Sequence, residues 1–468
     1  MKYLSTRGAG NDLTFKNILF AGLASDGGLY VPEKWPVIDF NKLKSLNSYS
    51  DLALEIIYPF INNDIGKEEL KKLIDNAYAD FSKKDIITFK RLKQKETVVE
   101  LFNGPTLAFK DFAMQLIVPI FDYYLSKENK KLNLIVATSG DTGSAAISAV
   151  QASPNINIFC LFPKGRISKF QRKQMSTLYG KNIFPIEIDG TFDDCQNIVK
   201  TILIDKVFSE EFYIAAVNSI NWSRVMIQIV YYFHTLIVNN VTFDEPINFS
   251  VPTGNFGDIY AGYVAYKMGL PINKLIIATN ENDILDRFLK TGVYSIGEVT
   301  KTTSPSMDIA IASNFERLLF DLCNKSTSET SAKMIELDEA KRFSLNNSQV
   351  NKAKNIFDSK KVSQEEVSKL IQETYNKFNY IIDPHTAIGL SASRSINDSL
   401  SNNFILSTAH PIKFSETVEK AIGRSMDEHE EYADMFKKEE KFYSLDNSTN
   451  KVKEIIKNGE QTLLLTII

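Results

Sequence analysis

Lys110 follows a turn-forming sequence and stands at the expected start of a helix. The run is Leu101-Phe-Asn-Gly-Pro-Thr-Leu-Ala-Phe-Lys-Asp-Phe-Ala-Met-Gln115. Apolar residues at helical spacing predict a helix over 112–126, so Lys110 comes just before its first turn. The helix dipole and the neighbours Phe109 and Phe112 disfavour the ammonium form, and we expect a lowered pKa for the amine. A neutral amine is a nucleophile toward carbonyl groups, whereas the simpler alternative is a solvated lysine.

Two glycine-rich turns each follow an apolar run and precede a helical pattern. They are Thr138-Ser-Gly-Asp-Thr-Gly-Ser144 and Pro252-Thr-Gly-Asn-Phe-Gly-Asp258. Glycines let backbone N–H groups converge on an anion, and the dipole of the following helix adds attraction. Close packing of a strand against a helix is the alternative explanation for either turn alone.

The two turns and the lysine together restrict the kind of ligand. Neither turn fits G-x-G-x-x-G or G-x-x-x-x-G-K-[ST], so a dinucleotide or a nucleoside triphosphate is not supported. A carbonyl-reactive lysine with two anion sites instead indicates a phosphorylated aldehyde cofactor bound to the lysine. The second anion site would then hold a substrate carboxylate.

Short apolar runs that alternate with helical patterns place these turns in a fold. The runs expected as strands are 134–137, 158–162, 184–188, 213–217, 247–251, 275–278 and 404–407. Repeated βα units imply parallel sheets covered by helices, with ligands at the carboxyl ends of the strands. We therefore expect an α/β fold.

The pattern of apolar and charged residues divides the rest of the chain into regions. One amphipathic helical face is formed by Leu70, Leu73, Ile74, Ala77, Tyr78 and Phe81. We expect an N-terminal helical module over 1–95, an α/β core over 96–420 and a C-terminal extension over 421–468. Within the core, we expect a smaller subdomain at about 127–215 and a charged, glycine-free, mostly helical insertion at about 321–377.

Composition narrows the functional class. The chain has 468 residues, 44% hydrophobic residues and a net charge of −3, which suits a globular protein and gives no electrostatic reason to expect nucleic acid or membrane as a partner. No apolar run is long enough to span a membrane and no secretory leader is evident, so we expect a cytoplasmic protein. The cysteines (Cys160, Cys195 and Cys323) and the histidines (His234, His385, His410 and His429) are scattered, and we expect neither disulfides nor a metal.

The chain resembles the fold-type II family of pyridoxal-phosphate enzymes and, within it, the longer bacterial and fungal type of threonine synthase. The motifs that carry the resemblance, in chain order, are 5–8, 26–32, 102–112, 137–143, 217–224, 252–258, 313–317, 383–386 and 408–414. They span nearly the whole chain. The resemblance implies two parallel-sheet subdomains with helices on both faces and an N-terminal helical module.

By this resemblance the chain would use pyridoxal 5'-phosphate to convert O-phospho-L-homoserine and water to L-threonine and phosphate. Lys110 would bind the cofactor and shuttle protons between the α, β and γ carbons of the substrate. The residues that would bind the cofactor phosphate are Gly254, Asn255, Phe256 and Gly257, with Asp258 opening the helix. The residues that would face the substrate carboxylate and the cofactor's 3-hydroxyl are Ser139, Gly140, Asp141 and Thr142. Thr408 would meet the pyridine nitrogen. Shorter relatives commonly carry Asn where this chain has Asp141, and an ionised carboxylate cannot donate a hydrogen bond to the hydroxyl.

The substrate phosphate needs donors of its own. Arg224 is a candidate because the guanidinium fork suits a phosphate dianion, with Asn218, Ser219 and Asn221 beside it; a salt bridge is the alternative. Lys164 and Arg166 are further candidates, or solvated loop charges. His385 and His410 could be catalytic bases, but the lysine already fills that role, so we expect structural hydrogen bonds.

Three rival functions share parts of this pattern. A phospholyase on phosphohomoserine or a related γ-phosphorylated substrate would share the early steps but would not add water at the β carbon. A serine or threonine dehydratase needs no second phosphate site. A non-catalytic phospholigand-binding scaffold would have no use for a desolvated amine. We expect a monomer or a homodimer that binds a small-molecule substrate.

Overall fold

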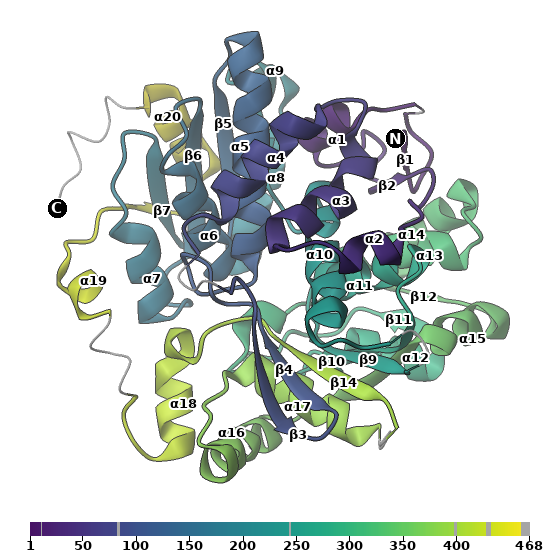
Figure 1. Ribbon diagram of the computed structural model, residues 1–468. Helices are drawn as coiled ribbons and strands as arrows, with labels where there is room; N and C mark the ends of the chain where they lie inside the picture. Colours follow the sequence, from purple (N-terminus) through teal and green to yellow (C-terminus); the bar gives the residue numbers. More distant parts are fainter. Residues whose placement is uncertain (11, 82–84, 243–244, 397–399, 427–431, 460–468) are drawn as a thin grey trace. The chain divides into compact units, whose positions relative to one another are not determined.

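The computed structural model describes residues 1–10, 12–81, 85–242, 245–396, 400–426 and 432–459. The chain forms two compact units, each described by itself. The larger unit comprises Met1–Asn103 and Ser219–Arg424, and the smaller unit comprises Gly104–Asn218 and Ser425–Ile468. Each unit has a main β-sheet with covering helices, so the predicted α/β class is confirmed (Figure 1).

The larger unit contains a six-stranded sheet with the order β13-β10-β9-β14-β4-β3. Its strands are β3 (Thr88–Lys93), β4 (Glu96–Glu100), β9 (Ile247–Pro252), β10 (Ile272–Thr279), β13 (Phe357–Lys361) and β14 (Asn402–Ser407). All neighbours are parallel except β3, which is antiparallel to β4. All six residues of the central strand β9 are buried, because both faces of this strand are covered.

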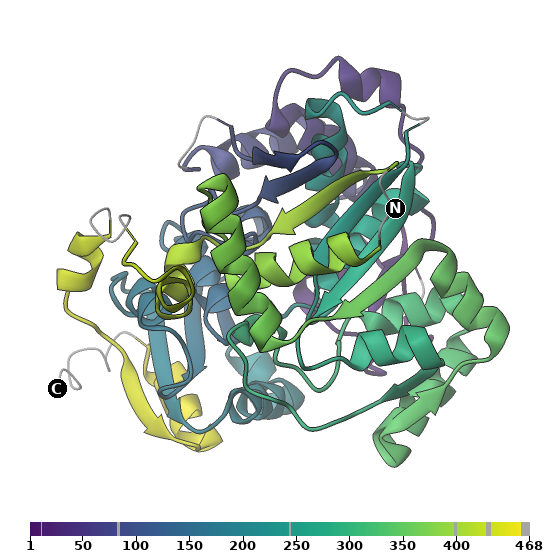
Figure 2. The same ribbon diagram turned by 90° about the horizontal axis from the view of Figure 1, so that it is seen from below.

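Several helical segments of the larger unit lie between its strands in the sequence or follow them. They are α10 (Trp222–Val238), α11 (Gly257–Lys267), α12 (Ile284–Thr291), η1 (Pro305–Met307), α13 (Phe315–Leu322), α17 (Pro384–Ser395), η2 (Pro411–Phe414) and α18 (Ser415–Ile422). Helix α17 packs on β9, β10 and β14, and Figure 2 shows it lying across these strands. Helix α11 packs on α10 and on β9 and β10.

The N-terminal part of the larger unit is mostly helical. Its elements are β1 (Tyr3–Ser5), α1 (Phe15–Ala21), β2 (Tyr30–Pro32), α2 (Phe40–Lys44), α3 (Tyr49–Ile61) and α4 (Lys67–Tyr78). The expected amphipathic helix is α4, which buries Leu70, Ile74, Ala77 and Tyr78. Helix α3 packs on α10, so this part shares a core with the sheet.

The segment 321–377 is not entirely helical. It contains α14 (Thr327–Ala340), β12 (Arg342–Ser344), α15 (Asn347–Ile356), β13 and α16 (Gln364–Phe378). Strand β12 pairs with β11 (Val293–Ser295), while β13 forms an edge of the large sheet. The β13 sequence Phe-Asp-Ser-Lys-Lys carries little of the apolar signal of a buried strand, because an edge strand is only partly covered.

The smaller unit has a five-stranded parallel sheet with the order β15-β7-β6-β5-β8. Its strands are β5 (Leu132–Ala137), β6 (Ile156–Pro163), β7 (Ile183–Asp189), β8 (Ile214–Ala216) and β15 (Tyr443–Asp446). Its helices are α5 (Lys110–Glu128), α6 (Asp141–Val150), α7 (Lys169–Ser176), α8 (Phe192–Ile204), α9 (Lys206–Glu211), α19 (Ala433–Lys437) and α20 (Thr449–Asn458). The C-terminal segment therefore belongs to this unit, and Val452, Ile455 and Ile456 of α20 join the core between the sheet and α8.

Candidate active site

The turn before Lys110 is held by a buried carboxylate. Asp111 is fully buried and accepts hydrogen bonds from the Thr106 backbone N–H at 2.8 Å and the Thr106 hydroxyl at 2.6 Å. A Cβ on Gly104 would lie 2.5 Å from Asp111 Cβ, so only glycine fits there. Helix α5 begins at Lys110, two residues earlier than predicted, and the lysine is its first residue.

Lys110 forms an ion pair inside the smaller unit. Its Nζ lies 3.2 Å from Asp141 Oδ2, and the Lys110 and Asp141 side chains are 13% and 3% exposed. Gln171 Nε2 donates to Asp141 Oδ1 at 2.8 Å, so the carboxylate accepts from two sides. The Phe109 ring centroid lies 4.9 Å from Nζ. The predicted aromatic neighbour is present, but Asp141 gives the ammonium form a partner that sequence reasoning did not provide.

Sequence reasoning also missed Gln171. It lies in α7, three residues after the N-cap Ser168, with which it forms a capping box. The Ser168-x-x-Gln171 spacing predicts a helix start, but not that the amide reaches a carboxylate thirty residues away in the sequence. The contact depends on packing: a Cβ on Gly140, at φ +129°, would lie 2.3 Å from Gln171 Cδ.

The first glycine-rich turn uses part of its donors internally. Thr138 Oγ1 accepts from the backbone N–H groups of Gly140 and Gly143, both at 2.9 Å. These two N–H groups therefore stabilise the turn. Ser139 and Thr142 are the partly exposed residues of this turn, whereas Gly140 and Asp141 are buried.

The second glycine-rich turn links β9 to α11. Phe256 precedes the helix in the left-handed region at φ +63°, which is uncommon for a bulky residue and turns the backbone sharply into the first N–H groups of α11. A Cβ on Gly254 would meet the Ser306 carbonyl oxygen at 2.7 Å. The Asp258 carboxylate accepts from Tyr231 and Tyr232, so its side chain is held by the core.

The segment 313–317 contacts this turn. Asn314 donates from its backbone N–H and from Nδ2 to the Asn255 carbonyl, at 3.0 and 2.9 Å, and from Nδ2 to the Ser219 carbonyl at 3.1 Å. The Ser313 hydroxyl donates to Asn255 Oδ1 at 3.0 Å and lies 3.3 Å from the Ser219 hydroxyl. Two segments predicted to bind phosphates, around Asn255 and Ser219, are thus joined within the larger unit.

The predicted substrate-phosphate segment opens α10. Asn221 is the N-cap: its Oδ1 accepts from the Ser223 backbone N–H and hydroxyl, and its Nδ2 donates to the Leu19 carbonyl at 3.0 Å. Its side chain is therefore used by the fold. Arg224 is 4% exposed, and burial lowers the pKa of its guanidinium to about 10, so it remains a cation at neutral pH. Asn218, the last residue of the smaller unit's first segment, is partly exposed.

Lys164 and Arg166 follow β6 in the smaller unit. Both are exposed, as is Gly165 between them. The Lys164 backbone N–H donates to the Ile188 carbonyl at 2.9 Å, which fixes the start of the loop but not the side chain.

Thr408 stands at the end of β14, as predicted from the strand pattern. It is 6% exposed. The preceding Ser407 is anchored at its carbonyl by the Leu101 backbone N–H at 2.9 Å and at its hydroxyl by Thr386 at 2.7 Å. The strand end is therefore fixed from two neighbouring segments.

Both histidines near the motifs make structural hydrogen bonds. His385 Nδ1 lies 2.6 Å from Asp383 Oδ2, and Asp383 caps α17. His410 Nδ1 accepts from the Ile412 backbone N–H at 3.2 Å. His429 lies outside the described residues. Among the residues that the structure describes, no cluster of His, Cys, Asp and Glu could hold a metal ion, and no helix could span a membrane.

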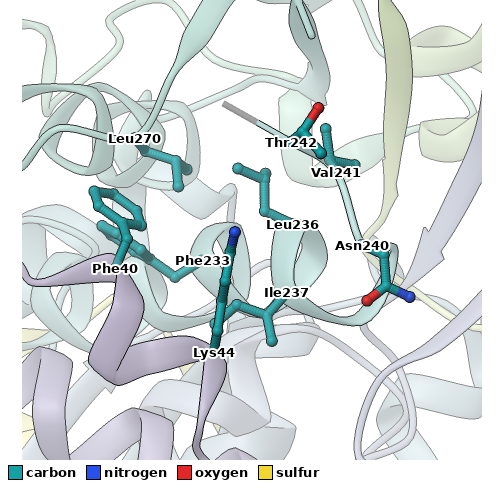
Figure 3. A pocket seen from close by; sticks show the side chains of 9 residues that line it. All are labelled: Phe40, Lys44, Phe233, Leu236, Ile237, Asn240, Val241, Thr242 and Leu270. Atoms are coloured by element: carbon teal, nitrogen blue, oxygen red, sulfur yellow. The ribbon is translucent and has the colours of Figure 1, made fainter. Parts of the chain in front are cut away.

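A cavity elsewhere in the larger unit is not this site. It has a volume of about 180 Å³ and lies between α2, α10 and the residues after α10 (Figure 3). Its lining residues are Phe40, Lys44, Phe233, Leu236, Ile237, Asn240, Val241, Thr242 and Leu270. None of them is a predicted site residue.

Three protein families match the chain. Residues 2–78 match the threonine synthase N terminus, residues 90–345 match the pyridoxal-phosphate dependent enzymes, and residues 386–456 match the C-terminal part of threonine synthase. The middle match covers the lysine and both glycine-rich turns.

Similar proteins and structures agree with the families. The threonine synthase of Pseudomonas aeruginosa is 44% identical over 460 residues, 97% of this chain and 98% of the relative. That of Saccharomyces cerevisiae is 41% identical over 457 residues, 90% of this chain and 89% of the relative. The crystal structure of PLP-bound threonine synthase from Brucella melitensis superposes with a TM-score of 0.94 at 40% identity, over 98% of this chain and 100% of that one. The yeast structure has a TM-score of 0.91 at 38% identity over 98% of each chain.

Proposed function

Because this chain belongs to the threonine synthase family of pyridoxal-phosphate enzymes, we propose that it converts O-phospho-L-homoserine and water to L-threonine and phosphate. The chain is a PLP-dependent lyase with the fold-type II architecture. The observation that carries the proposed substrate is the match at both ends of the chain, since the families at 2–78 and 386–456 are both described as threonine synthase.

The residues of the two units suit pyridoxal phosphate. Lys110 supplies a primary amine at a partly accessible position, with a carboxylate partner. The turn from Gly254 to Gly257 supplies backbone donors at the start of α11, where the helix dipole favours a phosphate. Thr408 supplies a neutral hydroxyl for the pyridine nitrogen. We propose that Gly254, Asn255, Phe256 and Gly257 bind the cofactor phosphate together with the backbone of Asp258. When bound, pyridoxal phosphate withdraws electrons from the carbon atoms of the substrate.

Binding of the substrate requires two anion sites. We propose that Ser139 and Thr142, the partly exposed residues of the first turn, bind the substrate carboxylate beside Gly140. Arg224 would bind the substrate phosphate, because a buried guanidinium gains most from a charge-assisted contact. Asn218 and Ser219 would assist it, and Asn221 would act by capping the helix that carries the arginine. Lys164 and Arg166 are the exposed alternatives.

Lys110 would move the protons of the reaction. It would take the proton from the α carbon and exchange protons at the β and γ carbons, while the carbon–oxygen bond at the γ carbon breaks and phosphate leaves. Water then gives its hydroxyl to the β carbon and its proton to the released phosphate, while Lys110 returns the protons it removed to the γ and α carbons. Asp141, held by Gln171, would orient the amine between these transfers. We propose that the released phosphate, kept by Arg224, is the base that delivers water.

Product analysis tests the proposed function. The purified protein should show the visible absorbance of a lysine-bound cofactor, and incubation with O-phospho-L-homoserine should yield threonine and phosphate in equal amounts. If 2-oxobutanoate is the main product, the protein is a phospholyase instead. Absence of both products with an intact cofactor signal would refute any activity on this substrate.

We propose further properties that accompany this function. The parts 1–95, 96–420 and 421–468 would act as an N-terminal module, a catalytic core and a C-terminal extension. The protein would work in the cytoplasm as a monomer or a homodimer, without nucleic acid or membrane as a partner. Light scattering of the purified protein measures the oligomeric state. The balanced net charge of −3 supports the absence of a polyanionic partner.

A further inference from the structure

Asn314 is fully buried and directs both of its donor groups to backbone carbonyls of other segments. Its backbone N–H and Nδ2 both donate to the Asn255 carbonyl, and Nδ2 also donates to the Ser219 carbonyl. It precedes α13, but its side chain makes no capping bond to that helix. The Nδ2 group is thus used to hold two distant loops.

The orientation of the Asn314 amide is fixed by Arg317. The guanidinium has only donors, and Nη1 donates to Asn314 Oδ1, so the amide must present its oxygen to Arg317 and its Nδ2 to the carbonyls. Arg317 is itself fully buried and donates from Nη2 to the Ile220 carbonyl at 2.5 Å and from Nε to the Tyr30 carbonyl at 2.9 Å. The arginine therefore holds both the asparagine and the loop beside Ser219.

A hydrogen bond that fixes the direction of a backbone carbonyl also fixes the direction of the N–H group of the following residue. The peptide bonds of the described residues are all trans, and in a trans peptide the C=O and the following N–H point in opposite directions. With the Asn255 carbonyl turned toward Asn314, the Phe256 N–H points away from Asn314. With the Ser219 carbonyl held by the same Nδ2, the Ile220 N–H is oriented in the same way.

The left-handed conformation of Phe256 needs such support. A bulky residue at φ +63° is costly and persists only where the surroundings hold it. The Phe256 ring packs edge-on against Phe315 at 5.7 Å, directly after Asn314, so side chain and backbone are held by the same segment. Asn314 Nδ2 would lie only 3.3 Å from a Cβ on Gly257, which shows how closely the amide approaches the turn.

We propose that Asn314 is a positioning residue that holds the cofactor-phosphate turn and the substrate-phosphate segment in one arrangement, with Arg317 as its support. The inference rests on the proposed function for the roles of the two segments. The inference goes beyond the proposed function because it assigns one side chain to both phosphate sites. Loss of the Asn314 amide donors should therefore weaken cofactor binding and phosphate binding together.

The test compares Asn314→Asp and Asn314→Ala with Asn248→Asp. Asn314→Asp keeps the shape but places an acceptor against two carbonyls, and Asn314→Ala removes the contacts without adding charge. Asn248 is an equally buried asparagine of the larger unit, whose Nδ2 donates to Asn403 Oδ1 at 3.0 Å near the start of β9, so it controls for the loss of any buried amide. Thermal unfolding identifies variants that do not fold.

Three measurements are made on each folded variant: the dissociation constant of PLP by equilibrium dialysis, the ³¹P chemical shift of bound PLP, and the dissociation constant of inorganic phosphate by isothermal titration calorimetry of the PLP-loaded protein. For both Asn314 variants we expect the PLP dissociation constant and the phosphate dissociation constant each to rise by about tenfold or more, as for the loss of two buried hydrogen bonds, together with a changed chemical shift. Asn248→Asp should change none of them beyond twofold.

Two outcomes would overturn the proposal: a rise in only one of the two constants, or equal rises in Asn248→Asp. If Asn314→Asp does not fold, Asn314→Ala alone decides. Cofactor binding and its ³¹P shift do not depend on which product is formed. A wild type that binds PLP but makes no threonine would therefore refute the proposed function and leave this comparison valid.

Discussion

At the scale of single residues, the lysine of the candidate site is defined by its partners. The sequence placed Lys110 beside aromatic rings at a helix start, and the structure adds the carboxylate of Asp141 at 3.2 Å. An ammonium group with a buried carboxylate partner is held in one direction, and this orientation suits the cofactor-binding role proposed for Lys110. Gln171 completes the arrangement by keeping the second carboxylate oxygen occupied.

Replacement of the lysine should abolish catalysis without unfolding the protein. Lys110→Ala removes the amine but creates little cavity, since Lys110 is at a helix end with its side chain partly exposed. We expect threonine formation to fall at least ~10³-fold, because both cofactor attachment and proton transfer are lost. Borohydride reduction of the wild type followed by peptide mapping should label Lys110; label on another lysine, with turnover kept in Lys110→Ala, would contradict the assignment.

Loss of the buried guanidinium should affect the substrate and spare the cofactor. Arg224→Ala should lower kcat/KM by about 10²-fold, as expected for a buried charge-assisted contact of roughly 2–5 kcal/mol. The visible absorbance should stay the same. The product ratio should move toward 2-oxobutanoate, because phosphate is held less firmly. Chromatography of the products measures this ratio. If Arg224→Ala keeps the wild-type kcat/KM, the substrate phosphate would instead bind at Lys164 and Arg166.

At the scale of elements, packing alone restricts Gly254 of the second glycine-rich turn, apart from any role in the proposed cofactor site. A Cβ on Gly254 would collide with the Ser306 carbonyl at 2.7 Å, and this neighbour is backbone that cannot move aside. The Asn255 side chain, in contrast, makes one hydrogen bond to Ser313. The backbone of the turn is thus more constrained than its side chain.

Substitutions in this turn should separate backbone from side-chain effects. Gly254→Val should raise the PLP dissociation constant by about tenfold or more, since the turn has to shift. Asn255→Ala should raise it by no more than about fivefold, because its backbone donor and carbonyl remain. Equilibrium dialysis measures both. Unchanged affinity in Gly254→Val, with the fold intact, would remove this turn from the cofactor site.

The strands show which parts of the fold a sequence can reveal. Each of the seven apolar runs predicted as strands overlaps a strand, although 213–217 is a strand only over Ile214–Ala216, because buried parallel strands carry their signal locally. Strand β13 was not predicted, since its partly exposed residues lack that signal. The pairing of β15 with β7 joins residues more than two hundred and fifty positions apart and has no local signature. The site divides in the same way: the lysine and both turns were predicted, whereas Gln171 and Asn314 act through contacts that only the folded chain creates.

At the scale of the whole molecule, one partly buried histidine links stability to pH. His234 of α10 lies against Tyr49 at 5.2 Å and Phe89 at 6.1 Å, so it joins the N-terminal helices to the strand β3. Its Nδ1 has no hydrogen-bond partner among the described residues. Burial lowers the pKa of His234 from 6.5 to about 4, against a small opposing effect of Asp85.

The sign of the pH effect follows from proton binding. Between pH 6.5 and 4 the unfolded chain binds a proton at His234 that the folded chain does not, so the free energy of unfolding decreases as the pH falls through this window. Above pH 6.5 the group is neutral in both states and has no effect; below pH 4 both states bind the proton. The loss is at most about 3 kcal/mol.

Replacement of this histidine should therefore flatten the pH dependence. His234→Phe keeps an aromatic ring and removes the titration, so the wild-type-minus-variant difference in unfolding free energy should fall by about 1–3 kcal/mol from pH 7 to pH 4.5. Carboxylates that titrate in the same pH range contribute equally to both proteins, so their contributions cancel in this difference. A difference that does not change with pH reflects the altered packing of the side chain alone. Urea unfolding of both proteins, followed by fluorescence at several pH values, gives the measurement. Parallel curves for the two proteins would mean that His234 takes up its proton in the folded state as readily as in the unfolded chain, and that its surroundings are open to water.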